Sequence, residues 1–222
     1  MASDYEEGLK LYKASRYNEA LTFLEKAPWK ETPEAAYYLM LTLTHLERNE
    51  KALYFCDFLL QNESSFLKVL QVRMVQALLL IELKRWTEAE QVLKGLMKEG
   101  VESPQIYCAY GFVLCSMGKH REGLKLYNQA IQKDPNNPNA LNSMAYTLAE
   151  EGIHLEKALH NARRALAARP NSVLYLDTMG WVFHKMNQFK MAQYYLKRAL
   201  DLDPKNLVIQ DHYRQSLQRS TP

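Results

Sequence analysis

Histidine and cysteine are the residues whose spacing could hold a metal ion or support nucleophilic catalysis. The six histidines never stand four apart on one predicted helix face, and Cys56, Cys108 and Cys115 include no CxxC pair. Zinc sites and dithiol redox centres are built from such short spacings. We therefore expect no metal site and no redox centre, and we interpret the cysteines as small buried apolar residues.

Short motifs that position a nucleophile, a phosphate or a dinucleotide are also absent from the sequence. There is no Gly-x-Ser-x-Gly, no phosphate-binding loop, no His-Glu-x-x-His and no Gly-x-Gly-x-x-Gly. Each of these motifs fixes reactive groups on a defined turn or helix face. Neighbouring carboxylates such as Glu150 and Glu151 are interpreted as solvated groups near a helix end. The sequence predicts a protein that is not an enzyme and that needs no cofactor.

A small residue recurs along almost the whole chain at a nearly constant spacing. Its successive intervals are 32, 37, 34, 35 and 34 residues, along Ala20, Ala52, Ala89, Gly123, Ala158 and Ala192. A period near 34 residues is typical of stacked helix pairs, in which each pair buries its apolar face on its neighbours. Only eight glycines and eight prolines interrupt the 222 residues, which also favours helices.

Proline and turn residues divide the chain into six repeats. Pro135, Pro170 and Pro204 mark the ends of second helices, because proline lacks the amide hydrogen that a continuing helix needs. Asp134-Pro135-Asn136-Asn137-Pro138 is turn chemistry between two repeats. We place the repeats at about 4–28, 33–64, 70–101, 104–137, 138–171 and 173–206.

A last amphipathic segment follows the sixth repeat at residues 207–218. The ends of a repeat array need a polar outer surface, so this segment is interpreted as a capping helix. We expect Leu207, Tyr213 and Leu217 to face the array. Together, residues 4–218 are expected to form a single array.

The repeats resemble tetratricopeptide repeats (TPRs). The family pattern has a Trp or Leu, then Leu-Gly and Tyr, followed by Gly-x-Tyr, Ala, Phe or Tyr, Ala and Pro. The sixth repeat follows this pattern with Leu176, Met179, Gly180, Phe183, Phe189, Ala192, Leu196, Ala199 and Pro204. The resemblance implies an all-α, right-handed superhelical solenoid of antiparallel helix pairs that binds other proteins.

The resemblance also implies that the first helices of the pairs line a concave groove. Phe112, Tyr146 and Trp181 fall at the same place in successive repeats, and exposed aromatic side chains often anchor partners. The alternative left open is that these aromatic side chains pack in the core. The partner-binding candidates on this analogy are Tyr5, Tyr12, Tyr37, Leu41, Met74, Leu78, Phe112, Asn139, Asn142, Tyr146, Asp177, Trp181 and His184.

Two functional hypotheses follow from this resemblance. The leading one is a scaffold or adaptor that captures a peptide or helix of a partner protein in the aromatic groove. The alternative is a structural or assembly module of a bacterial envelope, secretion or motility complex, acting through self-association or its convex face. Some family members grip acidic chaperone tails with Lys and Arg, and the corresponding positions here lack those cations, so no such binding is expected.

Charge is nearly balanced overall but unevenly distributed along the chain. The net charge is only +3, so no nucleic-acid partner is expected. Residues 1–118 carry 13 Lys and Arg against 16 Asp and Glu, whereas residues 119–222 carry 15 against 9; this excess is interpreted as a solvated outer face. No apolar run is long enough to span a membrane. We expect a cytoplasmic protein as the chain stands, or a periplasmic or envelope-anchored one if the native amino terminus was trimmed.

Overall fold

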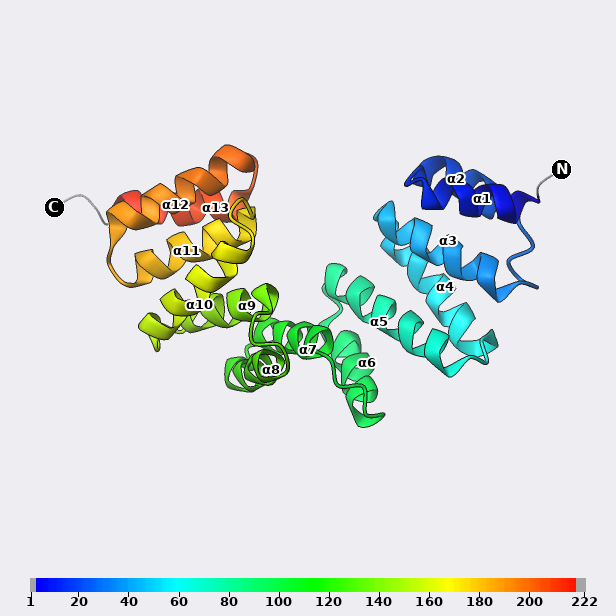
Figure 1. Ribbon diagram of the computed structural model, residues 1–222, viewed down its shortest axis with the longest axis horizontal. Helices are drawn as coiled ribbons and strands as arrows, with labels where there is room; N and C mark the ends of the chain where they lie inside the picture. Colours follow the sequence, from blue (N-terminus) through cyan, green and yellow to red (C-terminus); the bar gives the residue numbers. More distant parts are fainter. Residues whose placement is uncertain (1–2, 219–222) are drawn as a thin grey trace. The chain divides into compact units, whose positions relative to one another are not determined.

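The protein is described by a computed structural model over residues 3–218. Every regular element in that range is an α-helix (Figure 1), so the all-α class predicted from the sequence is confirmed. The thirteen helices of the described residues are α1 (Asp4–Lys13), α2 (Tyr17–Leu24), α3 (Pro33–His45), α4 (Asn49–Asn62), α5 (Phe66–Glu82), α6 (Trp86–Lys98), α7 (Pro104–Ser116), α8 (His120–Lys133), α9 (Pro138–Glu150), α10 (Leu155–Ala168), α11 (Val173–Lys185), α12 (Phe189–Leu202) and α13 (Leu207–Gln218).

The chain divides between Val101 and Glu102 into two compact units. The amino-terminal unit contains α1–α6, and the carboxy-terminal unit contains α7–α13. In each unit the two helices of a pair pack on each other, and the second helix also packs on the first helix of the next pair. The six helix pairs and the capping helix expected from the sequence are therefore present, although α5 begins at Phe66, before the predicted boundary. One continuous array over residues 4–218 stays a prediction.

The recurring small residues lie where the paired helices approach each other most closely. A Cβ added to Gly123 would overlap Sγ of Cys115, and one added to Gly180, on the helix that faces Ala192, would lie 3.1 Å from the backbone oxygen of that alanine. Such positions have no room for a larger side chain. The period read from the sequence is therefore the period of helix contacts. Its alanine members, all fully buried, are Ala20, Ala52, Ala89, Ala158 and Ala192.

The start of each first helix in the carboxy-terminal unit is fixed by a side-chain cap. The side-chain oxygen of Ser103, Asn137 or Ser172 accepts a hydrogen bond from the backbone N–H three residues later, at 3.0–3.4 Å. Asn206 makes the same cap before α13, to the N–H of Ile209 at 3.3 Å. These caps satisfy N–H groups that have no partner inside the helix. The same kind of cap therefore starts four alternate helices, α7, α9, α11 and α13, at nearly equal spacing.

The capping helix is present, but its buried face differs from the one expected. Leu207 and Leu217 are 76% and 44% exposed, whereas Ile209, His212 and Ser216 are buried. The expectation for the two leucines was therefore wrong. The cap at Asn206 sets the helical phase, and that phase turns the polar His212 inward.

The turn inside most helix pairs places one residue in the left-handed region of backbone conformation. Gly118 adopts a φ of 78° there, while Lys84 adopts a φ of 56° in the equivalent turn of the third pair. A side chain in this region brings Cβ too close to a carbonyl oxygen and costs about 1–2 kcal/mol. Glycine avoids that contact, although it loses more conformational freedom on folding.

We expect Lys84→Gly to raise the free energy of unfolding by about 0.5–1 kcal/mol, because relief of the Cβ contact exceeds the added entropy loss. Gly118→Ala is the matched opposite change, since nothing lies within 4 Å of the added Cβ, and it should lower stability by about 1 kcal/mol. Urea unfolding followed by circular dichroism measures both. A Lys84→Gly variant less stable than the parent protein would contradict this account.

Candidate functional site

A cavity of about 400 Å³ lies in the carboxy-terminal unit, between α7, α9 and α11. Apolar side chains from three helices form part of its wall, namely Phe112 of α7, Leu174 of α11 and Val208 of α13. Phe112 and Leu174 are 46% and 60% exposed, so the mouth of the cavity is open to a partner. Asn142 and Asp177 are buried polar groups deeper in the same wall. An apolar cavity with a few fixed polar groups is the usual composition of a binding site.

Four of the seven candidates predicted in this unit line the cavity: Phe112, Asn142, Tyr146 and Asp177. Leu174 and Val208 also line it but were missed by the sequence argument. Leu174 lies one helical turn before Asp177, so the spacing alone could have placed it on the same helix face. Val208 could not be placed, because the phase of the capping helix was misassigned.

Two residues that line the cavity, His120 and Asn142, each carry a buried hydrogen-bonding atom that has no partner among the described residues, and Asn142 is the more deeply buried of the two. The Asn142 side chain is 3% exposed, and within the part of the chain that the structure describes its Oδ1 atom has no hydrogen-bond partner. A buried polar atom without a partner destabilises a fold by about 1–3 kcal/mol. An amide kept under this penalty at the edge of a cavity is suited to meeting a ligand atom.

Asp177 is held by the capping helix. Its Oδ1 lies 2.8 Å from Nδ1 of His212, and both side chains are 7% exposed. His212 follows Asp177 by 35 residues, as Asp177 follows Asn142, so the three occupy the same place in successive repeats. This place therefore carries three different polar groups in a row.

Trp181 lies in a stack of three rings beneath the capping helix. Its ring centroid lies 4.1 Å from that of His212 and 4.8 Å from that of His184, with nearly parallel planes. The indole Nε1 also donates a hydrogen bond to Glu150. Trp181 is 5% exposed. We expected a groove position that takes little part in packing, and the burial of Trp181 contradicts that expectation because α13 lays His212 over the ring.

Tyr146 lies between the cavity and this stack. Burial raises the pKa of its hydroxyl to about 12, and the negative charges of Glu150 and Asp177 add to the effect. The hydroxyl is therefore neutral near pH 7 and can both donate and accept a hydrogen bond.

The thiols behave as packing groups. Burial raises the pKa of Cys56 to about 12 and that of Cys108 to about 11, and it raises the pKa of Cys115 as well. A thiol must lose its proton to act as a nucleophile or a metal ligand. Cys56 is buried as expected, whereas Cys108 and Cys115 are partly exposed and Cys115 lines the cavity.

The remaining candidates of the carboxy-terminal unit lie outside the cavity. His184 is buried in the ring stack. Asn139 is exposed at the start of α9 and accepts a hydrogen bond from the hydroxyl of Tyr175. Neither side chain lines the cavity wall. A direct role in binding for these two residues stays a prediction.

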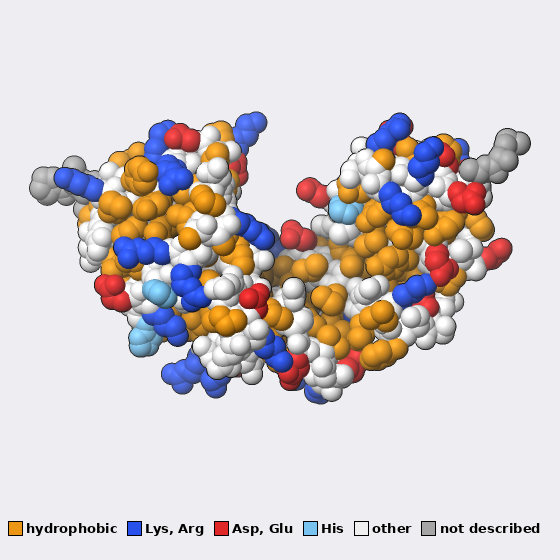
Figure 2. Space-filling model, viewed as in Figure 1, with side chains coloured by type: hydrophobic (Ala, Val, Ile, Leu, Met, Phe, Trp, Pro, Cys, Tyr) orange, Lys and Arg blue, Asp and Glu red, His pale blue; other side chains and the backbone are white. Residues whose placement is uncertain are grey.

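Three of the candidates in the amino-terminal unit, Tyr5, Tyr12 and Tyr37, form an aromatic cluster with Tyr38. The Tyr38 ring, which the sequence argument did not select, lies 5.3 Å from that of Tyr12, 5.7 Å from that of Tyr37 and 6.4 Å from that of Tyr5. Hydrophobic side chains gather over this unit in Figure 2. All of the predicted candidates here are at least partly accessible; they are Tyr5, Tyr12, Tyr37, Leu41, Met74 and Leu78.

Membrane-spanning helices and metal-binding clusters are both absent from residues 3–218. In residues 3–218, no helix combines the length and the apolar character that crossing a lipid bilayer requires. Over the same residues, no cluster of three or more His, Cys, Asp or Glu side chains could hold a metal ion.

Two segments of the carboxy-terminal unit match models of one repeat family. Residues 111–152 match a TPR repeat, and residues 175–206 match a tetratricopeptide repeat. The chain is a tetratricopeptide-repeat protein. Each match covers first and second helices of the paired type described above, and it confirms the resemblance found in the sequence.

Two relatives of this TPR protein are longer than the chain. TPR repeat-containing protein PA4667 of Pseudomonas aeruginosa is 32% identical over 78 residues, which are 35% of this chain and 13% of that protein. Human protein O-mannosyl-transferase TMTC1 is 24% identical over 202 residues, which are 88% of this chain and 22% of that protein. The chain thus spans less than a quarter of either relative.

Solved structures share the TPR fold at low sequence identity. A tetratricopeptide repeat protein from Parabacteroides merdae is 16% identical with a TM-score of 0.74, over 96% of this chain and 83% of that one. YrrB, described as a TPR protein with an unusual peptide-binding site, is 20% identical with a TM-score of 0.58, over 86% of this chain and 97% of that one. At such identities the likeness concerns the fold alone.

Proposed function

We propose that the protein is a non-catalytic scaffold that binds a peptide or helix of a partner protein in the cavity of its carboxy-terminal unit. The observation that carries the proposal is the unpartnered amide of Asn142 in a cavity with an open apolar mouth. The apolar wall supplies binding energy, and the amide fixes the position of the bound segment. YrrB, a TPR protein with a peptide-binding site, supports the same use of the fold.

The aromatic residues divide between two roles in this proposal. Phe112 is 46% exposed and Tyr146 is partly buried at the cavity, so both can contact a partner directly. Trp181 contributes indirectly. Its ring stacks on His212, and His212 in turn forms a hydrogen bond with Asp177 at the cavity. The accessible candidates of the amino-terminal unit, including Tyr12 and Tyr37, would form a second surface that contacts a partner.

Replacement of Asn142 by leucine is expected to raise stability and weaken peptide binding. The variant removes an unsatisfied buried amide and keeps a similar volume, so the free energy of unfolding should rise by about 1 kcal/mol. Binding of peptides selected from a random display library should fall at least about tenfold, roughly 1.4 kcal/mol. Urea unfolding and isothermal titration calorimetry measure the two effects.

Asn161 of α10 supplies the matched control. It is 5% exposed, its Nδ2 atom also lacks a partner among the described residues, and it does not line the cavity. Asn161→Leu should therefore gain stability in the same way while peptide binding stays unchanged. Equal binding by the parent protein and Asn142→Leu would overturn the proposed function.

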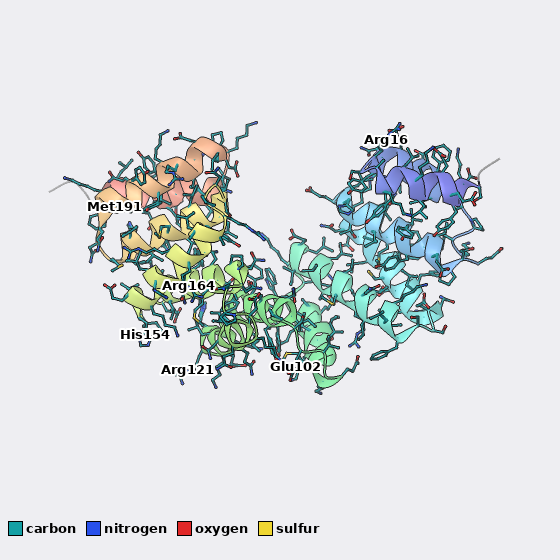
Figure 3. The ribbon with its side chains drawn as sticks, in the orientation of Figure 1. Arg16, Glu102, Arg121, His154, Arg164 and Met191 are labelled. Atoms are coloured by element: carbon teal, nitrogen blue, oxygen red, sulfur yellow. The ribbon has the colours of Figure 1, made fainter. Side chains whose placement is uncertain are left out.

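A second candidate function uses the outer face of the same unit. Helices α8, α10 and α12 carry nine Lys and Arg against three Asp and Glu, and Figure 2 shows blue side chains over α8 and α10. Arg121 and Arg164 come from these helices, and the exposed Met191 comes from α12 (Figure 3). This pattern favours an assembly module that joins an acidic surface of a larger complex. Salt-sensitive co-sedimentation with such a complex, lost in Arg121→Glu but kept in Asn142→Leu, would identify that role.

A further inference from the structure

The two faces of the carboxy-terminal unit differ in charge. The outer helices hold nine cations, but the inner helices α7, α9 and α11 contain just Glu150, Asp177 and Lys185 as Asp, Glu, Lys or Arg. Both carboxylates line the cavity, and no Lys or Arg is among its lining residues. The cavity is therefore the acidic part of an otherwise basic unit.

Each carboxylate has an oxygen left over for a ligand. The hydrogen bond of Asp177 to His212 uses Oδ1, and the contacts of Glu150 with Trp181 and Lys185 use Oε1. Their second oxygens make no hydrogen bond or ion pair within the described residues. The Asp177 side chain is 7% exposed, and a carboxylate in such a desolvated site interacts more strongly with a cation than one in bulk water; Glu150, at 39% exposed, adds its charge from the mouth of the cavity.

The neighbouring repeat already holds a cation in this way. The Nζ atom of Lys185 lies 4.8 Å from the centre of the Trp181 ring and 3.9 Å from Oε1 of Glu150. Tyr146 and Glu150 stand 35 residues before Trp181 and Lys185, so α9 repeats the aromatic ring but replaces the lysine with a carboxylate. The cavity beside Tyr146 thus has a ring and a carboxylate from α9, and Lys185 contacts that carboxylate only through Oε1.

We propose that this cavity takes a single lysine or arginine side chain from an otherwise apolar segment of the partner. The cation would lie near Glu150, Asp177 and the Tyr146 ring, and Asn142 Oδ1 would accept one of its N–H groups. Phe112 and Leu174 would contact the flanking apolar residues. This inference rests on the proposed function and specifies its partner.

The test selects heptapeptides from a random display library on the immobilised full chain. The enriched peptides are expected to share one Lys or Arg between apolar residues. Replacing that residue with norleucine should weaken binding at least about tenfold in calorimetry, and the loss should shrink to less than about threefold in Glu150→Gln/Asp177→Asn. Thermal unfolding is measured for the double variant and for Glu150→Gln alone. Melting temperatures close to that of the parent protein would show that the carboxylates act on binding and not on folding.

Glu156→Gln is the matched control, because it removes the same charge from an exposed position on α10. It should leave both the affinity and the norleucine effect unchanged. Enrichment of apolar or acidic peptides that are sensitive to Asn142→Leu would overturn the cation inference and leave the proposed function standing. Failure to enrich any peptide that is sensitive to Asn142→Leu would overturn both.

Discussion

Replacing Trp181 with alanine is expected to lower the free energy of unfolding of the carboxy-terminal unit by about 3–5 kcal/mol, the usual effect of truncating a buried aromatic side chain. The ring is 5% exposed and is enclosed by His184 and His212. Its loss would also remove the hydrogen bond donated to Glu150. Urea unfolding monitored by circular dichroism measures the change.

Phe112→Ala is the control that separates packing from binding. Phe112 occupies the same place two repeats earlier but is 46% exposed, so its removal should lower stability by less than about 1 kcal/mol. Binding of groove-directed peptides should nevertheless fall at least about tenfold. If Trp181→Ala were as stable as Phe112→Ala, the ring stack beneath α13 would not contribute to folding as described.

Removal of the chain from Leu207 onward is expected to destabilise α11 and α12 by at least about 3 kcal/mol. The deletion exposes the buried Trp181 ring, which costs about 1.5–3 kcal/mol, and it removes the hydrogen bond between Asp177 and His212, which contributes about 1.5–3 kcal/mol. It also removes the backbone acceptor of Gln193 on α12. Hydrogen exchange should accelerate in residues 173–202.

The remainder of the carboxy-terminal unit should respond less to that deletion, because stability in a repeat array depends mainly on nearest neighbours. Exchange in α7 and α8 should therefore change little. Leu217→Ala serves as the mild control, since Leu217 is 44% exposed. Uniform acceleration across α7–α12 would contradict local capping and indicate that the unit unfolds as one block.

The helix pairs were predictable from sequence because the recurring small residue is a steric requirement. A Cβ at Gly123 would meet Cys115 and the backbone of Gly111 on the facing helix, so only a small residue fits at that position. The face of α13 was not predictable in the same way, since apolar character indicated Leu207 and Leu217, whereas the cap at Asn206 set another phase. Propensity and hydrophobic pattern fix an element more reliably than its rotation.

The residues of the candidate site could be predicted only in part from the sequence. Its residues share a repeat position, which placed Phe112 and Tyr146 on one face, but burial depends on the neighbours in space. Trp181 became a core residue because α13 covers it. That Asn142 lacks a partner could not be read from the sequence, because it depends on every group around the amide.

Asn142, Asp177 and His212 occupy the same position in successive repeats. The side chain at this position changes from an amide to a carboxylate and then to an imidazole. The helix contacts that hold this position are made by other residues, the invariably small ones. The contacts within each helix pair therefore depend mainly on the small residues, although Asp177 and His212 also hold the capping helix. Under the proposed function, a single substitution at the position of Asn142 would change which partner segment is bound while leaving the contacts of the small residues intact.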